Sequence, residues 1–218
     1  MARFDHLVVA AADMAVGAQW LADHLGVPLA PGGRHAAMGT HNRLLRLGDH
    51  TYLELIAIDP EAPAPDRPRW FGLDDPVLQQ RLVAGPQLVH WVAASEDLPT
   101  EAIAAGYAGA DILAMSRGDF RWRITAPPDG TRRYGGLLPS LIQWDVPTHP
   151  ARRLPESGCR LMKLEAFCRE PESLRSALAA IGLATAIDLQ SPPTGETSEW
   201  VAYLETPRGL VELAAPLG

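Results

Sequence analysis

The sequence predicts an α+β fold in which one short order of elements, strand-helix-strand-strand-strand, occurs three times in tandem. Each copy opens with an apolar, strand-like run, continues through an acidic residue that can cap a helix, and ends in further strand-like runs. A shared spacing supports the repeat, because the acidic residue follows one residue of the first strand by seven positions in every copy. The aligned pairs are His6 and Asp13, His90 and Asp97, and Lys163 and Glu170.

The first copy, residues 1–58, begins with the apolar run Arg3–Ala11, which predicts a strand. Asp13 is a favourable N-cap, and apolar residues at helical spacing after it predict a helix that Gly26 ends. A glycine turn at residues 32–33 then leads to three expected strands: Ala36–His41, Asn42–Leu47 and Thr51–Ile58.

The second and third copies, residues 87–146 and 159–218, repeat this order. In the second copy a short helix follows Asp97, and the expected strands are Gln87–Ser95, Ile112–Arg117, Phe120–Ala126 and Ser140–Val146. In the third copy the helix has an apolar face, and the expected strands are Cys159–Phe167, Ala184–Gln190, Trp200–Glu205 and Leu210–Ala215. Two connectors separate the copies: the proline-rich residues 59–86, with a short helix near Val77–Val83, and residues 147–158.

Composition and charge restrict the possible partners. The net charge of −7 comes with no basic patch or stripe in the sequence, which argues against a nucleic-acid partner. The longest uninterrupted apolar stretch, Leu7–Ala12, is too short to span a bilayer, and the N-terminus has no recognisable secretory signal, so we expect a cytoplasmic protein. The two cysteines, Cys159 and Cys168, are expected to be reduced thiols.

Three stretches of the sequence resemble one known family. They are FDHLVVAA at residues 4–11, GGRHAAMGTHNRLLRLGDHTYLELIA at residues 32–57 and LVHWVAASEDL at residues 88–98. Together with the tandem βαβββ units, they are similar to the glyoxalase-like branch of the vicinal oxygen chelate superfamily, which resembles glyoxalase I, extradiol dioxygenases and bleomycin-resistance proteins in fold. The resemblance implies a cupped, partly open mixed β-barrel with helices outside. The third βαβββ-like unit, at the C-terminus, would pack alongside or form a dimer contact.

The resemblance also implies a metal site on the first and last strands of the two units. Position by position, the four slots hold His6, Glu54, His90 and Gln143. Strand alternation places the first three on apolar faces, beside Phe4 and Val8, Tyr52 and Ile56, and Leu88 and Val92, respectively. Imidazole and carboxylate ligands suit a divalent metal ion such as Fe2+, Mn2+, Zn2+, Ni2+ or Co2+. Lys163 occupies the histidine slot of the third unit, which argues against a metal there.

A dense polar segment that is typical of this branch follows the first predicted helix. The residues expected to orient a substrate are His35, Asn42, His41, Arg34 and Thr40, with Arg34 as a bidentate partner for an anionic group. In the alternative interpretation, the segment is a turn or β-bulge whose Asn and Thr side chains bond their own backbone. Trp91 and Trp144 adjoin two of the ligand slots and are therefore expected on the opposite faces of their strands, as core residues.

These observations favour a small-molecule metalloenzyme of the lyase, isomerase or dioxygenase type. The metal ion would bind neighbouring oxygens of a substrate and stabilise an anion, and Glu54 would be the catalytic residue that moves a proton. One alternative is a metal-free protein of the bleomycin-resistance type that binds or sequesters a small molecule. Another is a scaffold whose cup is filled by its own side chains. The acidic surface is compatible with a homodimer.

Overall fold

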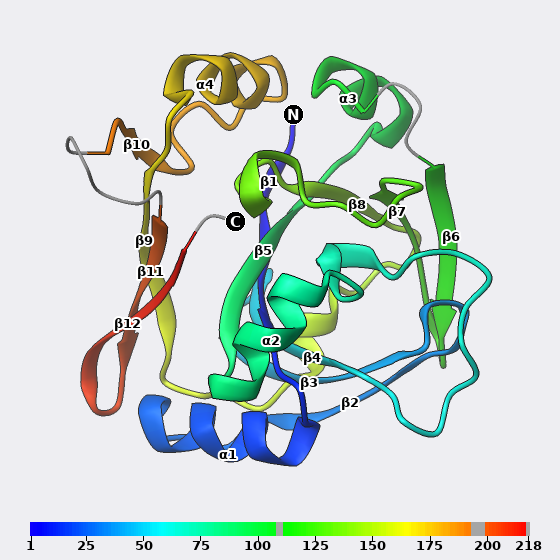
Figure 1. Ribbon diagram of the computed structural model, residues 1–218, viewed down its shortest axis with the longest axis vertical. Helices are drawn as coiled ribbons and strands as arrows, with labels where there is room; N and C mark the ends of the chain where they lie inside the picture. The colour runs from blue at the N-terminus through cyan, green and yellow to red at the C-terminus, as the bar shows by residue number, and fades with distance from the viewer. Residues whose placement is uncertain (108–110, 193–198, 217–218) are drawn as a thin grey trace.

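The protein, described here by a computed structural model of residues 1–107, 111–192 and 199–216, consists of two β-sheets with helices around them (Figure 1). The first sheet contains β1 (Arg3–Ala10), β2 (Ala30–His35), β3 (Thr40–Gly48), β4 (Thr51–Ile58), β5 (Gln87–Ala94), β6 (Asp111–Arg117), β7 (Phe120–Ala126) and β8 (Ser140–Trp144). Their order is β2-β3-β4-β1-β5-β8-β7-β6, and the edge strands β2 and β6 lie close together. This nearly closed, barrel-like sheet confirms the predicted fold class.

Four α-helices accompany the sheets in the described part of the chain: α1 (Met14–Leu25), α2 (Pro76–Ala84), α3 (Leu98–Ala104) and α4 (Pro171–Ala180). The predicted cap of α1 is confirmed, because the Asp13 side chain accepts a hydrogen bond from the backbone N–H of Val16 at 2.9 Å. Gly26 ends α1 in the left-handed conformation, with φ of 77°. In the described ranges, none of the helices has the length and apolar character needed to cross a membrane.

The second sheet is formed by the C-terminal part of the chain and packs on the outside of the barrel. Its strands are β9 (Arg160–Phe167), β10 (Asp188–Gln190), β11 (Glu199–Thr206) and β12 (Gly209–Pro216), in the order β10-β9-β11-β12. In Figure 1 this sheet lies beside β5, and β12 is in contact with β5. Leu164 and Trp200 share one apolar core with Leu7 and Trp91 of the barrel. The C-terminal unit is therefore an integral part of the fold.

The glycine-rich segment is a strand, which corrects the prediction of a turn. Residues 30–35 form β2, paired with β3, and residues 36–38 form a short 3-10 turn. The predicted strands Ala36–His41 and Asn42–Leu47 are replaced by the single strand β3. Proline and glycine are poor strand formers, so the local pattern misleads here, and pairing with the neighbouring strand decides the conformation.

Two β-bulges shift which residues face the barrel interior. Asp5 is an extra residue on β1, and Val89 is an extra residue on β5. Phe4 therefore packs on Trp91, with 5.8 Å between ring centroids, in the apolar core that the barrel shares with the C-terminal sheet, here called the outer core. The expectation that Phe4 shares a face with His6 was wrong. Leu88 likewise lies in the outer core, whereas Val92 lies in a second apolar core inside the barrel, here called the inner core. Each bulged residue directly precedes a histidine.

We expect Trp200→Ala to lower the free energy of unfolding by about 3–5 kcal/mol, because the ring is completely buried between the C-terminal sheet and the barrel. Urea unfolding followed by circular dichroism measures this change. The control is Leu210→Ala on β12, whose side chain is exposed and whose loss should cost no more than about 0.5 kcal/mol. Equal effects of the two changes would contradict a shared core.

Candidate functional site

A pocket opens into the barrel, and its lining combines aromatic rings with polar side chains. The rings belong to Tyr52, Trp70, Phe71, Trp122 and Trp144, and the polar groups to His6, His35, Asn42, Glu54 and Arg117. Its empty volume is about 350 Å³, including a part that is open to solvent. Small-molecule sites commonly have this form, with apolar walls and a few converging polar groups.

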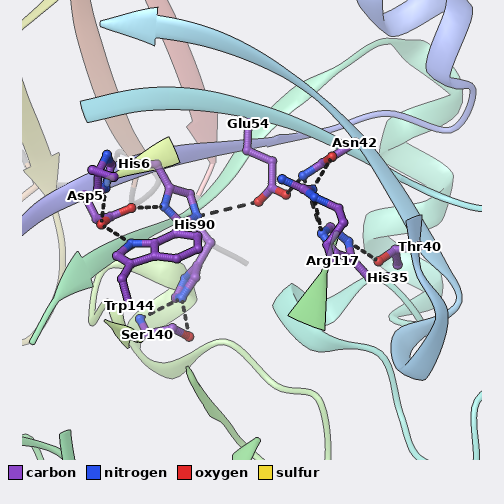
Figure 2. A network of polar contacts seen from close by, with 11 residues as sticks. Asp5, His6, His35, Thr40, Asn42, Glu54, His90, Arg117, Ser140 and Trp144 are labelled. Atoms are coloured by element: carbon purple, nitrogen blue, oxygen red, sulfur yellow. Dashed lines mark hydrogen bonds and ion pairs between the residues drawn. The ribbon is translucent and has the colours of Figure 1, made fainter. Parts of the chain in front are cut away.

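Asp5, His6 and Glu54 form a row (Figure 2), of which His6 and Glu54 line the pocket. The His6 ring lies between two carboxylates, with Nδ1 2.6 Å from Asp5 Oδ1 and Nε2 3.6 Å from Glu54 Oε2. The other oxygen of Asp5 accepts hydrogen bonds from Trp144 Nε1 at 2.9 Å and His149 Nε2 at 3.0 Å. The three members of the row expose 0%, 3% and 6% of their surface, so each needs these partners to offset lost hydration.

The pairing within the row determines its charge. Burial by itself lowers the pKa of His6, but the hydrogen bond to Asp5 and the contact with Glu54 outweigh it and raise the pKa to about 9. Burial raises the pKa of Glu54, yet His6 and other neighbours lower it to about 2. Burial also raises the pKa of Asp5, and the hydrogen bonds from His149 and His6 bring it below its usual value. At neutral pH the row is therefore carboxylate, imidazolium, carboxylate.

Asn42 connects Glu54 to Arg117 across the two edges of the barrel. Its Nδ2 donates to Glu54 Oε1 at 2.5 Å, and its Oδ1 accepts from Arg117 Nη1 and from the Gly33 backbone N–H, both at 2.9 Å. These partners fix the orientation of the amide, because a carboxylate only accepts and a guanidinium only donates. Glycine is required beside this amide, since a Cβ on Gly32 would lie 2.1 Å from Asn42 Oδ1.

His35 lies beside Asn42 as a neutral imidazole. Its Nε2 is 3.3 Å from Arg117 Nη1, which can only donate, so the ring proton is on Nδ1 and points to Thr40 Oγ1 at 3.1 Å. Burial lowers the pKa of His35 to about 4, which is consistent with this neutral form. Thr40 thus orients His35 from behind and is not in the lining of the pocket.

The second histidine of the predicted metal set is engaged elsewhere. His90 Nδ1 donates to the Gly136 carbonyl at 3.1 Å, and its Nε2 lies 3.0 Å from both the backbone N–H and the hydroxyl of Ser140. Burial lowers the pKa of His90 to about 3. His90 and Ser140 line a separate, smaller pocket of about 250 Å³. Binding a metal through Nε2 would break the bond to the Ser140 N–H and leave that buried donor unpaired.

The strand register shows that Ser140, and not Gln143, is the counterpart of Glu54 in the second unit. Val8 pairs with Glu54 between β1 and β4, and Val92, the counterpart of Val8 in the second unit, pairs with Ser140 between β5 and β8. The expectation that Gln143 faces the barrel interior was therefore wrong. Its Oε1 accepts from the Leu98 backbone N–H at the start of α3, outside the barrel.

The four predicted ligands consequently do not form a metal centre. His6 and Glu54 face each other, but Gln143 points away and both ring nitrogens of His90 are occupied. Over the described residues, no three His, Cys, Asp or Glu side chains are grouped closely enough to hold a metal ion. The residues present do not fit the divalent ion that the family resemblance implied.

Other predicted site residues are divided between the pocket and the surface. His35 and Asn42 line the pocket as expected, whereas His41 does not, because it alternates with Asn42 along β3. Arg34 is exposed and pairs with Glu61 and Asp59 outside the pocket. Trp144 lines the pocket, contrary to the expectation that it faces the other side, because β8 points Ile142 and Trp144 inward and Gln143 outward.

Sequence reasoning missed several residues of the pocket. Asp5 supports His6 from outside the lining, and simple alternation along the strand would turn it to the other face, which a bulge overrides. Arg117 ends a predicted strand, and Trp70 and Phe71 lie in the connector, where no periodic pattern indicates their direction. Their aromatic character in a proline-rich segment was the one available signal.

Comparison with known proteins identifies the family and the fold. The family model described as a glyoxalase-like domain matches residues 4–182. No curated protein sequence matches the chain. A hypothetical protein from Staphylococcus aureus has a similar structure, with a TM-score of 0.58 and 12% identity over 100% of this chain and 86% of that one. This likeness shows a shared fold.

Two epimerase structures are also similar at lower scores. Methylmalonyl-CoA epimerase from Mycobacterium tuberculosis has a TM-score of 0.40 and 22% identity over 65% of this chain and 85% of that one. A methylmalonyl-CoA epimerase in complex with methylmalonyl-CoA and NH4+ has a TM-score of 0.43 and 20% identity over 69% of this chain and 99% of that one.

We expect His6 to carry protons on both ring nitrogens at pH 7, with His35 and His90 neutral and protonated on Nδ1. Nitrogen-15 chemical shifts of the imidazoles measure this directly. Glu54→Gln should lower the pKa of His6 from about 9, whereas Glu61→Gln, on the surface, should not.

A histidine whose pKa is raised from 6.5 to about 9 stabilises the fold fully below pH 6.5, and this contribution is lost as the pH rises through 9. A neutral His6 at pH 7 would contradict the assigned row.

Proposed function

Because the chain belongs to the glyoxalase-like domain family of the vicinal oxygen chelate superfamily, we propose that it binds a small organic molecule in the barrel pocket without a metal ion. The row of Asp5, His6 and Glu54 carries this proposal. Ionised groups this deeply buried do little for stability compared with an apolar core, and strongly shifted pKa values cluster at functional sites.

The row offers two complementary groups to a bound ligand. His6 is a charged donor and Glu54 a charged acceptor, and both line the pocket. Around them the rings of Trp122, Trp144 and Tyr52 offer flat apolar surfaces. This combination supports a ligand with a flat, unsaturated body and at least one hydroxyl or amine that donates to Glu54.

The donor chemistry of the second unit argues against a metal ion in this pocket. Ser140 offers a hydroxyl where a carboxylate would complete a ligand set, and His90 is held by that residue and by Gly136. Metal ligands are usually deprotonated or neutral groups with a free lone pair. At neutral pH a metal ion would have to displace the proton that Asp5 and Glu54 stabilise on His6.

Binding fits Glu54 better than proton transfer does. A general base works best when its pKa is near the working pH. The pKa of Glu54, about 2, makes it a weak base, and the pKa of His6, about 9, makes it a weak acid at pH 7. Both values favour persistent charges that hold a ligand, so we assign Glu54 a binding role in place of the proton transfer expected from the sequence.

We expect ligand binding to be independent of metal. A small-molecule library screened by thermal unfolding should yield ligands whose stabilisation is the same in EDTA as with added Zn2+, Fe2+, Mn2+, Ni2+ or Co2+. Mass spectrometry of the purified protein should find well below about one metal ion per chain. About one ion per chain, lost in His6→Ala and His90→Ala but kept in the surface control His24→Ala, would contradict the proposal.

We expect Glu54→Gln to weaken the best ligand of that screen by about tenfold or more, because a charged acceptor is replaced by a neutral amide of the same shape. Isothermal titration measures the change. Glu61→Gln removes an exposed carboxylate that pairs with Arg34 outside the pocket and should leave affinity unchanged. Equal affinity of the Glu54→Gln variant and the unmodified protein would exclude Glu54 from the binding site.

A further inference from the structure

Arg117 reaches the pocket across the seam between the two edges of the barrel. It is the last residue of β6, and its half-buried side chain lines the pocket, where Asn42 links it to Glu54 (Figure 2). A glycine on the facing edge makes room for it, since a Cβ on Gly33 would lie 2.4 Å from Arg117 Cδ. The glycine pair of β2 therefore accommodates both Asn42 and this arginine.

Arg117 has no carboxylate partner among the described residues, unlike several other arginines of the protein. Arg34, Arg46, Arg69 and Arg123 each form an ion pair with a carboxylate. Both hydrogen bonds of Arg117 within the described chain come from Nη1 and go to uncharged acceptors, Asn42 Oδ1 at 2.9 Å and His35 Nε2 at 3.3 Å. A guanidinium has further N–H groups in a planar fork that suits a carboxylate or phosphate.

A second unpaired donor belongs to Trp70, another residue of the pocket lining. Trp70 exposes 3% of its surface, and its indole Nε1 has no hydrogen-bond acceptor among the described residues. Its ring packs edge-on to His35, with 5.1 Å between centroids, so it lies close to the neighbours of Arg117. A buried N–H without an acceptor is unfavourable and is satisfied when a ligand supplies one.

The Asn42 amide separates Glu54 from an anion at Arg117, because it donates to the carboxylate and accepts from the guanidinium. His6 supplies one positive charge beside the two carboxylates of the row. The pocket lining thus offers an acceptor at Glu54 and a donor at Arg117. A ligand that matches both groups would donate to Glu54 and carry negative charge at Arg117.

We propose that the ligand of this pocket is a small organic anion with a flat unsaturated body, whose carboxylate or phosphate group binds Arg117 and accepts from the Trp70 indole. The inference rests on the proposed small-molecule function and adds the chemical class of the ligand. Arg117 is then the specificity-determining residue, and its uncharged protein partners hold the side chain in place without neutralising it.

Paired probes test the charge preference. Isothermal titration in EDTA with benzoate and phenyl phosphate, and with the neutral benzamide and benzyl alcohol, should show at least one anion bound about tenfold or more tightly than its neutral counterpart. Benzoate and phenyl phosphate distinguish the two anionic groups. Neutral probes that bind as well as the anions would overturn the inference and leave the proposed function standing. Failure of all four probes would contradict both.

Variants assign the preference to Arg117. Arg117→Gln should remove the advantage of the anion over the neutral probe, whereas the control Arg121→Gln should retain it. Arg121 lies on the adjacent strand, is exposed and donates to the carbonyls of Gly118 and Phe120, so the control removes the same charge outside the pocket. An anion preference that persists in Arg117→Gln would overturn the assignment.

Two further variants guard against a loss of folding in Arg117→Gln. Gly33→Ala keeps the charge and displaces the Arg117 side chain, the flexible group that a new Cβ would meet, and should weaken only the anion. Trp70→Phe keeps an aromatic ring and removes the N–H, and should weaken the anion several-fold with little change for the neutral probe. Thermal unfolding checks that each variant is folded, and equal losses for both probe classes would overturn the inference.

Discussion

The burial of the Glu54 charge inside the barrel is the constraint on which the rest of the pocket depends. A carboxylate at 6% exposure requires donors on both sides, and these come from β1 through His6 and from β3 through Asn42. Each donor in turn needs its own support, which Asp5 gives to His6 and Gly33 to Asn42. One polar chain therefore crosses the barrel, running through His149, Asp5, His6, Glu54, Asn42 and Arg117.

The repeated units share a backbone feature and differ in the chemistry built on it. An extra residue precedes the aligned position in all three, giving the pairs Asp5–His6, Val89–His90 and Met162–Lys163. In the first unit that residue is an acid and can hold the imidazole in its charged form. In the second it is a valine, so the Nδ1 of His90 bonds a backbone carbonyl and the ring stays neutral. The same backbone feature thus carries a charged histidine in the first unit and a neutral one in the second.

The connector between the first two units contributes residues to the pockets of both His6 and His90. Trp70 and Phe71 line both the Glu54 pocket and the smaller pocket of His90. The Phe71 ring lies 5.0 Å from the His90 ring, and its backbone has a φ of 58°, an unfavourable conformation for a residue with a side chain. Burial of the two rings in the inner core stabilises this conformation. Part of the pocket wall is consequently supplied by a segment that lies outside the repeat.

Sequence reasoning was sufficient to predict the barrel class, the cap of α1 and four residues that line the pocket: His6, Glu54, His35 and Asn42. These follow from local periodicity, from capping chemistry and from a family resemblance. Strand pairing in the folded chain was needed to show that Ser140 replaces Gln143, that Asp5 bonds His6 and that Arg117 and Trp70 line the pocket. Such features depend on strand register and bulges, and pairing between distant segments sets the register, so a local pattern carries no signal for it.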